Sequence, residues 1–105
     1  MTEAEGKQKL AECRARIDAI DLRLLELLNE RTRVVEEIGK TKEEFALPIY
    51  EPKREEDVFR NVTEHNQGPL TPDALKSIFE RIIDEMRTLQ RMRREQREVQ
   101  GDKKC

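Results

Sequence analysis

The feature that most constrains the fold is a long segment, from about Lys7 to Glu44, that contains no proline and a single glycine, Gly39. Its apolar residues recur at intervals of three and four, the spacing that places them on one face of an α-helix. As a helix the segment would be about 55 Å long. A helix of that length is typical of a chain that packs along a partner. The apolar positions are Leu10, Cys13, Ile17, Ile20, Leu24, Leu27, Leu28, Val34, Val35 and Ile38.

The composition also favours pairing with a second chain. Of 105 residues, 42% are charged and only 35% are hydrophobic, and a chain this small buries little surface by itself. We therefore expect a single domain, residues 1–105, that completes its core in a homodimer. Its helical core should span about residues 7–93, and the charged tail, residues 94–105, should fray after Arg93.

Two breaks divide the chain into three helices. The first break, residues 46–52, ends with Pro52, which suits the first turn of a helix. The second, residues 66–72, contains Thr71, a good helix N-cap. The pattern predicts an all-α fold with one long helix, one short helix from Pro52 to about His65, and one of medium length from Pro72. His65 is interpreted as a surface residue at a helix end.

Several classes of protein are excluded by composition. With 21 basic and 23 acidic residues, the chain lacks the basic excess of nucleic-acid-binding proteins. It has no apolar run long enough to span a membrane, and its acidic N-terminus is unlike a signal peptide. Cys13 and Cys105 form neither a disulfide framework nor a metal site. These features predict a cytoplasmic protein without a metal or membrane partner.

The charges within the apolar stripe are the best pointer to function. A single buried charge can be explained by a side chain that reaches the rim, but several cations on one seam favour an anion-binding site, because burying an unpaired charge is costly. The seam alternates steps of four and three. It comprises Leu10, Arg14, Ile17, Asp21, Leu24, Leu28, Arg31, Val35, Ile38 and Lys42.

The spacing of the cations indicates a site that two chains share. Arg31 and Lys42 would lie on one face about 16 Å apart, close enough for both side chains to hold a small anion. Arg14 would lie about 25 Å from Arg31, too far to join them within one chain. An antiparallel second copy could supply Arg14 if the two-fold axis passes near residue 25. Two sites per dimer follow from this symmetry.

Several motifs, in order from about residue 10 to residue 92, resemble the AroQ-type, all-helical chorismate mutases. They are Arg14-x-x-Ile17-Asp18-x-Ile20-Asp21, Leu24-Leu25-x-Leu27-Leu28-Asn29-x-Arg31, Ile38-Gly39-x-x-Lys42, Pro48-Ile49-Tyr50-Glu51-Pro52-x-Arg54-Glu55, Asn66-x-Gly68-Pro69-Leu70 and Ile78-Phe79-x-x-Ile82-Ile83, followed by Gln90.

The resemblance implies the cofactor-free [3,3] rearrangement of chorismate to prephenate in an intertwined homodimeric helical bundle. By position, Arg31 and the second chain's copy of Arg14 would bind the substrate carboxylates. Lys42 would contact a carboxylate and the ether oxygen, and Gln90 would donate to the same oxygen. The remaining roles belong to the second helix and its start: Glu55 and the backbone near Glu51 would receive the ring hydroxyl, and Arg54 would add positive potential.

One position departs from the family pattern. Members often carry a serine one turn before the glutamine, where this chain has Met86. A hydrogen bond to a substrate carboxylate would then be missing, which bears on efficiency more than on identity. We interpret Met86 as a core residue, although its position counts among the substrate-binding positions of the site.

Three alternatives remain open from the sequence. An isochorismate pyruvate-lyase could use the same scaffold and cationic site, although the segment Pro48–Glu55 and the Gly68-Pro69-Leu70 turn favour the mutase. A non-enzymatic helical dimerisation module would use the seam charges only to set register, so Arg31→Ala would be neutral or stabilising. The chain could also be a domain of a larger shikimate-pathway enzyme.

Overall fold

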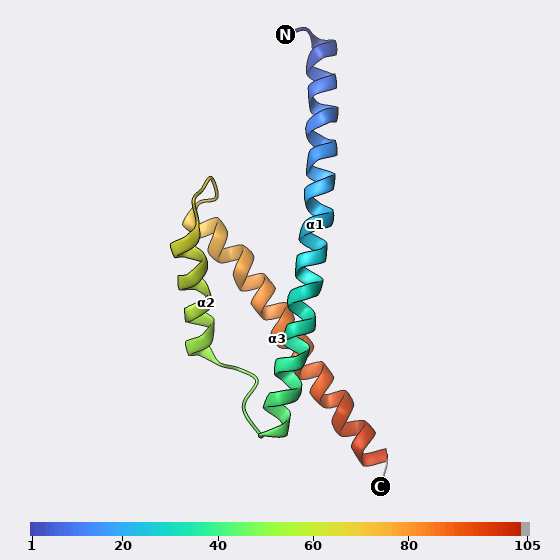
Figure 1. The fold of residues 1–105 in the computed structure, drawn as a ribbon, viewed down its shortest axis with the longest axis vertical. Helices are drawn as coiled ribbons and strands as arrows, with labels where there is room; N and C mark the ends of the chain where they lie inside the picture. Colours follow the sequence, from blue (N-terminus) through green and yellow to red (C-terminus); the bar gives the residue numbers. More distant parts are fainter. Residues whose placement is uncertain (104–105) are drawn as a thin grey trace. The chain divides into compact units, whose positions relative to one another are not determined.

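The computed structural model describes the backbone of residues 1–103 and the side chains of residues 1–101. Within that range it consists of three helices and no strand, which confirms the all-α prediction. The helices are α1 (Glu3–Glu44), α2 (Pro52–His65) and α3 (Pro72–Lys103) (Figure 1). Helix α1 begins earlier than expected, because the Thr2 hydroxyl accepts a 3.1 Å hydrogen bond from the backbone N–H of Glu5 and so caps the first turn.

The chain falls into two units, residues 1–33 and residues 34–105, and α1 runs through their boundary. The first unit is helical from Glu3 onward and leaves a series of large apolar side chains exposed. They are Leu10, Ile17, Ile20, Leu22, Leu24, Leu25, Leu27 and Leu28. Most of them belong to the apolar stripe that the sequence predicts. The single domain and the intertwined homodimer remain predictions.

The second unit contains the short core of the chain. Helix α2 lies beside the first half of α3, and α3 contacts the part of α1 that follows residue 33 through Gln90 and Arg97 (Figure 1). The buried apolar side chains of the described residues are Leu75, Ile83 and Met86, all on α3. Their intervals of eight and three positions keep them on one side of that helix. Burial of Met86 confirms its interpretation as a core residue.

Helix α1 ends in a Schellman motif without glycine. The N–H of Leu47 donates to the carbonyl of Lys42 at 2.7 Å, and the N–H of Ala46 donates to that of Glu43 at 3.2 Å. This pattern requires a left-handed residue, normally glycine, and here it is Ala46, with φ 54°. The motif turns the chain sharply into residues 47–51, which lead to α2.

The connection between α2 and α3 is closed by polar groups of its own. The Asn66 side chain donates to the carbonyl of Leu70 at 2.9 Å and accepts from the N–H of Gly68 at 3.0 Å. Gly68 has φ 81°, a conformation that glycine adopts without strain. Thr71 caps α3 by accepting the N–H of Ala74 at 3.1 Å, as predicted. His65 is an exposed helix-end residue, also as predicted.

The sequence predicts that α3 frays after Arg93. This prediction is wrong, because the helix continues to Lys103. Its arginines return to the end of α1 and to the connection that follows it. Arg97 pairs with Glu43, and Arg94 donates to the carbonyl of Leu47 at 3.2 Å. These contacts give the last turns of α3 a packing surface that its charged composition does not reveal. Cys105 lies outside the described residues.

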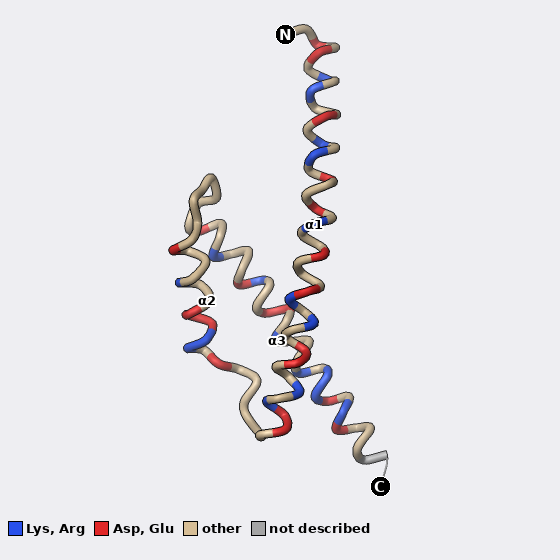
Figure 2. The backbone as a smooth tube through the Cα atoms, viewed as in Figure 1, with Lys and Arg blue, Asp and Glu red and all other residues tan. Residues whose placement is uncertain are grey.

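Basic and acidic residues are interspersed along all three helices (Figure 2). No helix in the described part of the chain has an apolar stretch long enough to cross a bilayer.

Candidate active site

Lys42 is the best-buried cation of the described residues. It lies in the last turn of α1 and is only 9% exposed. Its ammonium group donates to the carbonyl of Ile49 at 2.9 Å and pairs with Glu51 at 2.5 Å. Both partners belong to the connection that follows α1. The Schellman turn therefore brings that connection back over Lys42, where the Glu51 carboxylate compensates the lysine charge.

Gln90 approaches the same face of α1 from α3. It is 9% exposed, and its amide donates to the carbonyl of Val35 at 3.3 Å. A Cβ atom built on Gly39 would lie 3.6 Å from the Gln90 Cγ, so Gln90 packs directly on this glycine. Val35, Gly39 and Lys42 follow each other at intervals of four and three, so they share one helix face.

Lys42 and Gln90 are the two buried polar side chains among the residues whose burial is described. Each has donor capacity beyond the contacts just given. An ammonium group has three N–H donors and a primary amide has two. Two donors of Lys42 and one of Gln90 are used within the described chain. One N–H on each residue can therefore serve a ligand.

Glu51 immediately precedes α2 but does not cap it with its side chain. The carboxylate turns to Lys42 instead. The backbone near Glu51 is predicted to lie at the hydroxyl subsite, and the ion pair with Lys42 is a separate reason for an acidic side chain here. The position of Pro52 at the first turn of α2 is as expected.

Glu55 is half-buried on the first turn of α2 and faces α3 through Arg87. The guanidinium group of Arg87 lies 3.1 Å from the Glu55 carboxylate. Arg54, its neighbour, is exposed. Arg87 is not among the residues predicted from the sequence. A usable signal exists, because Arg87 sits between the buried residues Met86 and Gln90, where a cation interrupts the apolar face of α3 just as the seam cations interrupt that of α1.

The second unit thus contains six of the eight residues that the sequence analysis assigns to the site: Lys42, Glu51, Arg54, Glu55, Met86 and Gln90. The other two belong to the first unit. There Arg14 is exposed and Arg31 is half-buried. Their roles, like those of the other six, remain predictions.

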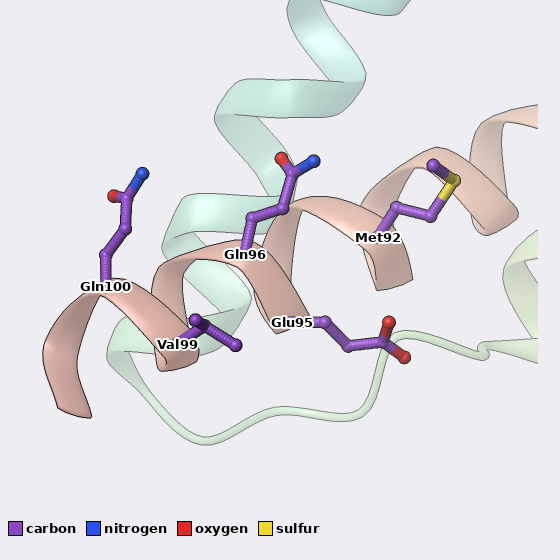
Figure 3. Close-up of a pocket in the computed structure, with 5 residues that line it drawn as sticks. All are labelled: Met92, Glu95, Gln96, Val99 and Gln100. Carbon is purple, nitrogen blue, oxygen red and sulfur yellow. The ribbon is translucent and has the colours of Figure 1, made fainter. Parts of the chain in front are cut away.

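A shallow hollow lies elsewhere, on the C-terminal half of α3. Its lining residues all come from that helix, where they follow each other at intervals of three and one and so share one broad face (Figure 3). They are Met92, Glu95, Gln96, Val99 and Gln100. None of them is a predicted site residue, so this hollow is separate from the Lys42–Gln90 cluster.

The fold and the cluster define a class of protein: an all-helical chain whose buried donors can bind an anionic or oxygen-rich ligand. The sequence matches the family described as "Chorismate mutase type II" over residues 13–91. The chain belongs to this family, which confirms the resemblance found from its motifs.

Individual relatives agree with the family. A bifunctional chorismate mutase/prephenate dehydratase of Aquifex aeolicus (strain VF5) is 35% identical over 88 residues, which cover 80% of this chain and 24% of that protein. A chorismate mutase of Methanocaldococcus jannaschii is 31% identical over 88 residues, covering 80% of this chain and 86% of that one. The chain spans about a quarter of the length of the first bifunctional relatives it matches.

Solved structures give the same result. Form II of a chorismate mutase from Thermus thermophilus aligns with a TM-score of 0.77 at 34% identity, covering 79% of this chain and 94% of that chain. Form I of the same enzyme aligns with a TM-score of 0.72 at 35% identity, covering 74% of this chain and 98% of that chain.

Proposed function

We propose that the chain catalyses the rearrangement of chorismate to prephenate. The observation that carries the proposal is the burial of Lys42 and Gln90 on facing sides of α1 and α3, each with an N–H available to a ligand. In this reaction one C–O bond breaks while one C–C bond forms within the same molecule, so no nucleophile or proton acceptor is needed. The enzyme must hold a compact substrate conformer and stabilise charge that develops on the ether oxygen.

The two buried donors are suited to that task. Lys42 is fixed by Ile49 and Glu51, so its third N–H points in a restricted direction instead of sampling many rotamers. Gln90 is held by Val35 and by packing on Gly39. Donors that are fixed before the reaction need no reorganisation when charge appears in the transition state. We assign both donors to the ether oxygen.

The proposal includes a homodimer with shared sites. The exposed apolar residues between Leu10 and Leu28 form a longer apolar series than a soluble monomer usually leaves in water. A second copy of the same helix is the occupant that matches it, because an antiparallel pair places like residues around a two-fold axis. Arg14 of one chain would then reach the carboxylates held by Arg31 and Lys42 of the other. A cytoplasmic location stays a prediction from the sequence.

The test is to follow chorismate loss and prephenate formation with the purified chain and no additive. Lys42→Met should lower kcat by about 10²–10³, the usual loss for one donor to a developing oxyanion. Lys40→Met is the matched control, because Lys40 is exposed on the same helix, and it should retain wild-type kcat. Pyruvate release from isochorismate with chorismate left untouched would identify the lyase and overturn the proposal.

A further inference from the structure

Arg87 joins three parts of the second unit. It lies on α3, and its guanidinium group is 3.1 Å from Glu55 on α2 and 2.9 Å from Asp84 on its own helix. Its Cζ also lies 4.9 Å from the ring centroid of Tyr50, within the range of a cation–π contact. Tyr50 belongs to the connection between α1 and α2. One side chain therefore fixes the end of that connection and the first turn of α2 relative to α3.

The contact with Glu55 is more buried than the i,i+4 ion pairs within α3, and the pair of Arg97 with Glu43 is buried to a similar degree. The side chains of Arg87 and Glu55 are 32% and 23% exposed, whereas those of Arg81 and Glu85, one turn apart on the same helix, are 79% and 62% exposed. Partial burial reduces screening by water and holds both groups in one geometry. A buried ion pair is a weak source of stability, because desolvation offsets the attraction. The main effect of this ion pair is therefore to fix the orientation of the two side chains, and not to stabilise the fold.

The residues that Arg87 holds are next to the predicted hydroxyl subsite. Glu55 is the predicted acceptor of the ring hydroxyl, and Tyr50 directly precedes Glu51, whose backbone is the second predicted contact there. Arg87 contacts one carboxylate oxygen, Oε1. This contact fixes the plane of the Glu55 carboxylate, so the direction of its other oxygen, Oε2, is fixed as well. The positive charge also weakens the repulsion between Glu55 and a substrate that carries two carboxylates.

We propose that Arg87 is a positioning residue for this subsite: it orients Glu55 and the Tyr50–Glu51 backbone toward the ring hydroxyl of the substrate. This inference rests on the proposed function. The hydroxyl takes no part in the bond changes, so Glu55 holds it equally in the ground state and the transition state. Loss of such uniform binding raises KM and leaves kcat unchanged.

Arg87→Met tests the inference, because methionine retains much of the side-chain stem and removes the charge. We expect KM for chorismate to rise about tenfold with kcat within about twofold of wild type, as for lost positioning of a bound group. Arg87→Lys should recover part of the affinity, since it keeps the charge without the fork that fits a carboxylate. Arg81→Met, the exposed control, should leave both constants unchanged.

A double-mutant cycle separates positioning from an independent role. Glu55→Gln should raise KM by itself, and adding Arg87→Met should then raise it little further. Effects of the two substitutions that simply multiply would overturn the inference. So would a lower apparent kcat at unchanged KM in Arg87→Met, which indicates a smaller folded fraction. If the wild-type chain does not convert chorismate at all, the proposed function itself fails, and that result is distinct from these.

Discussion

A lysine that is nine-tenths buried must have its charge compensated, and the way this is done at Lys42 suits a binding site. One carboxylate and one carbonyl satisfy it only partly, since an ammonium group has three donors. Full compensation within the chain would have left no donor for a substrate. The neutral amide of Gln90 is also satisfied only in part, because one of its two N–H groups donates to the carbonyl of Val35. The proposed chemistry therefore depends on buried side chains, Lys42 and Gln90, that each keep one N–H for the substrate.

Gln90→Glu should make activity depend on pH. An ionised carboxylate cannot donate to the ether oxygen, and it would also face the carbonyl of Val35 without a proton to share. The protonated carboxyl can donate. Burial raises the pKa of a carboxyl above its ordinary value of about 4.3, so activity should be low at neutral pH and increase as pH falls through that raised pKa. The measurement is kcat against pH for wild type and variant.

Gln96→Glu provides the control for this profile, because Gln96 lies on the same helix outside the Lys42–Gln90 cluster. Its kcat should follow the wild-type pH profile. A profile for Gln90→Glu that stays flat toward acid pH, in protein that remains folded, would remove Gln90 from the ether-oxygen contact.

Sequence reasoning about individual residues agrees with the observed burial where the pattern was local. The charges that interrupt the apolar stripe of α1 single out Lys42, and its burial agrees with that reasoning. Gln90 carries no local signal, since a glutamine in a charged helix is normally solvated, and only the family resemblance identified it. Arg87 was missed because its partners, Glu55 and Tyr50, are brought to it by the connection between α2 and α3.

The starts of α2 and α3 were predictable because proline or a capping residue marks them, whereas the Thr2 cap at the start of α1 was missed. Pro52 and Pro72 begin α2 and α3 as expected, and Thr71 supplies the cap. Helix α1 ends at Glu44, as expected, even though its left-handed position is filled by Ala46 and not by glycine. The length of α3 was underestimated. Contacts from Arg94 and Arg97 to residues near the end of α1 support its last turns, and tertiary contacts leave no periodic trace in a charged segment.

Ala46→Gly should therefore stabilise the protein. The left-handed conformation costs a residue with a Cβ about 1–2 kcal/mol, and glycine avoids this cost but loses about 0.5–1 kcal/mol of unfolded-state entropy. A net gain of about 0.5–1 kcal/mol in the free energy of unfolding is expected. Urea denaturation at one fixed protein concentration measures it. Activity should not change, because Ala46 makes no predicted contact with substrate.

Ala15→Gly is the opposite control for that measurement. Ala15 is exposed within α1, where glycine costs about 1 kcal/mol relative to alanine. If both substitutions destabilised the protein equally, the glycine at position 46 would behave as in an ordinary helix interior, and the Schellman termination of α1 would be contradicted.

At the scale of the whole molecule, the two units have different roles in the proposal. The second unit, residues 34–105, contains the two buried donors and the residues proposed for the hydroxyl subsite. The first unit, residues 1–33, contributes Arg14 and Arg31 together with the exposed apolar series. The three helices can be predicted from the sequence of one chain. The homodimer cannot, because it depends on which surfaces a second copy covers. The homodimer is therefore best tested through function and not through size alone.

Mixing Arg14→Ala and Arg31→Ala chains distinguishes a shared site from a site within one chain. Each variant alone should lose most activity, because every site in its homodimer lacks one arginine. In a heterodimer with shared sites, one site combines the intact Arg31 of one chain with the intact Arg14 of the other, while its twin lacks both. Random association makes about half of the dimers heterodimers, so about one quarter of the sites should be active.

The experiment requires that the two variants be unfolded and refolded together, with heterodimers verified by a mass tag on one chain. Each variant refolded alone serves as the control and should stay inactive, since exchange between identical chains restores nothing. If both arginines acted within one chain, each heterodimer site would still lack one of them, and mixing would give no recovery. Verified heterodimers without activity would therefore refute the antiparallel pairing of Arg14 with Arg31, even if the purified chain converts chorismate.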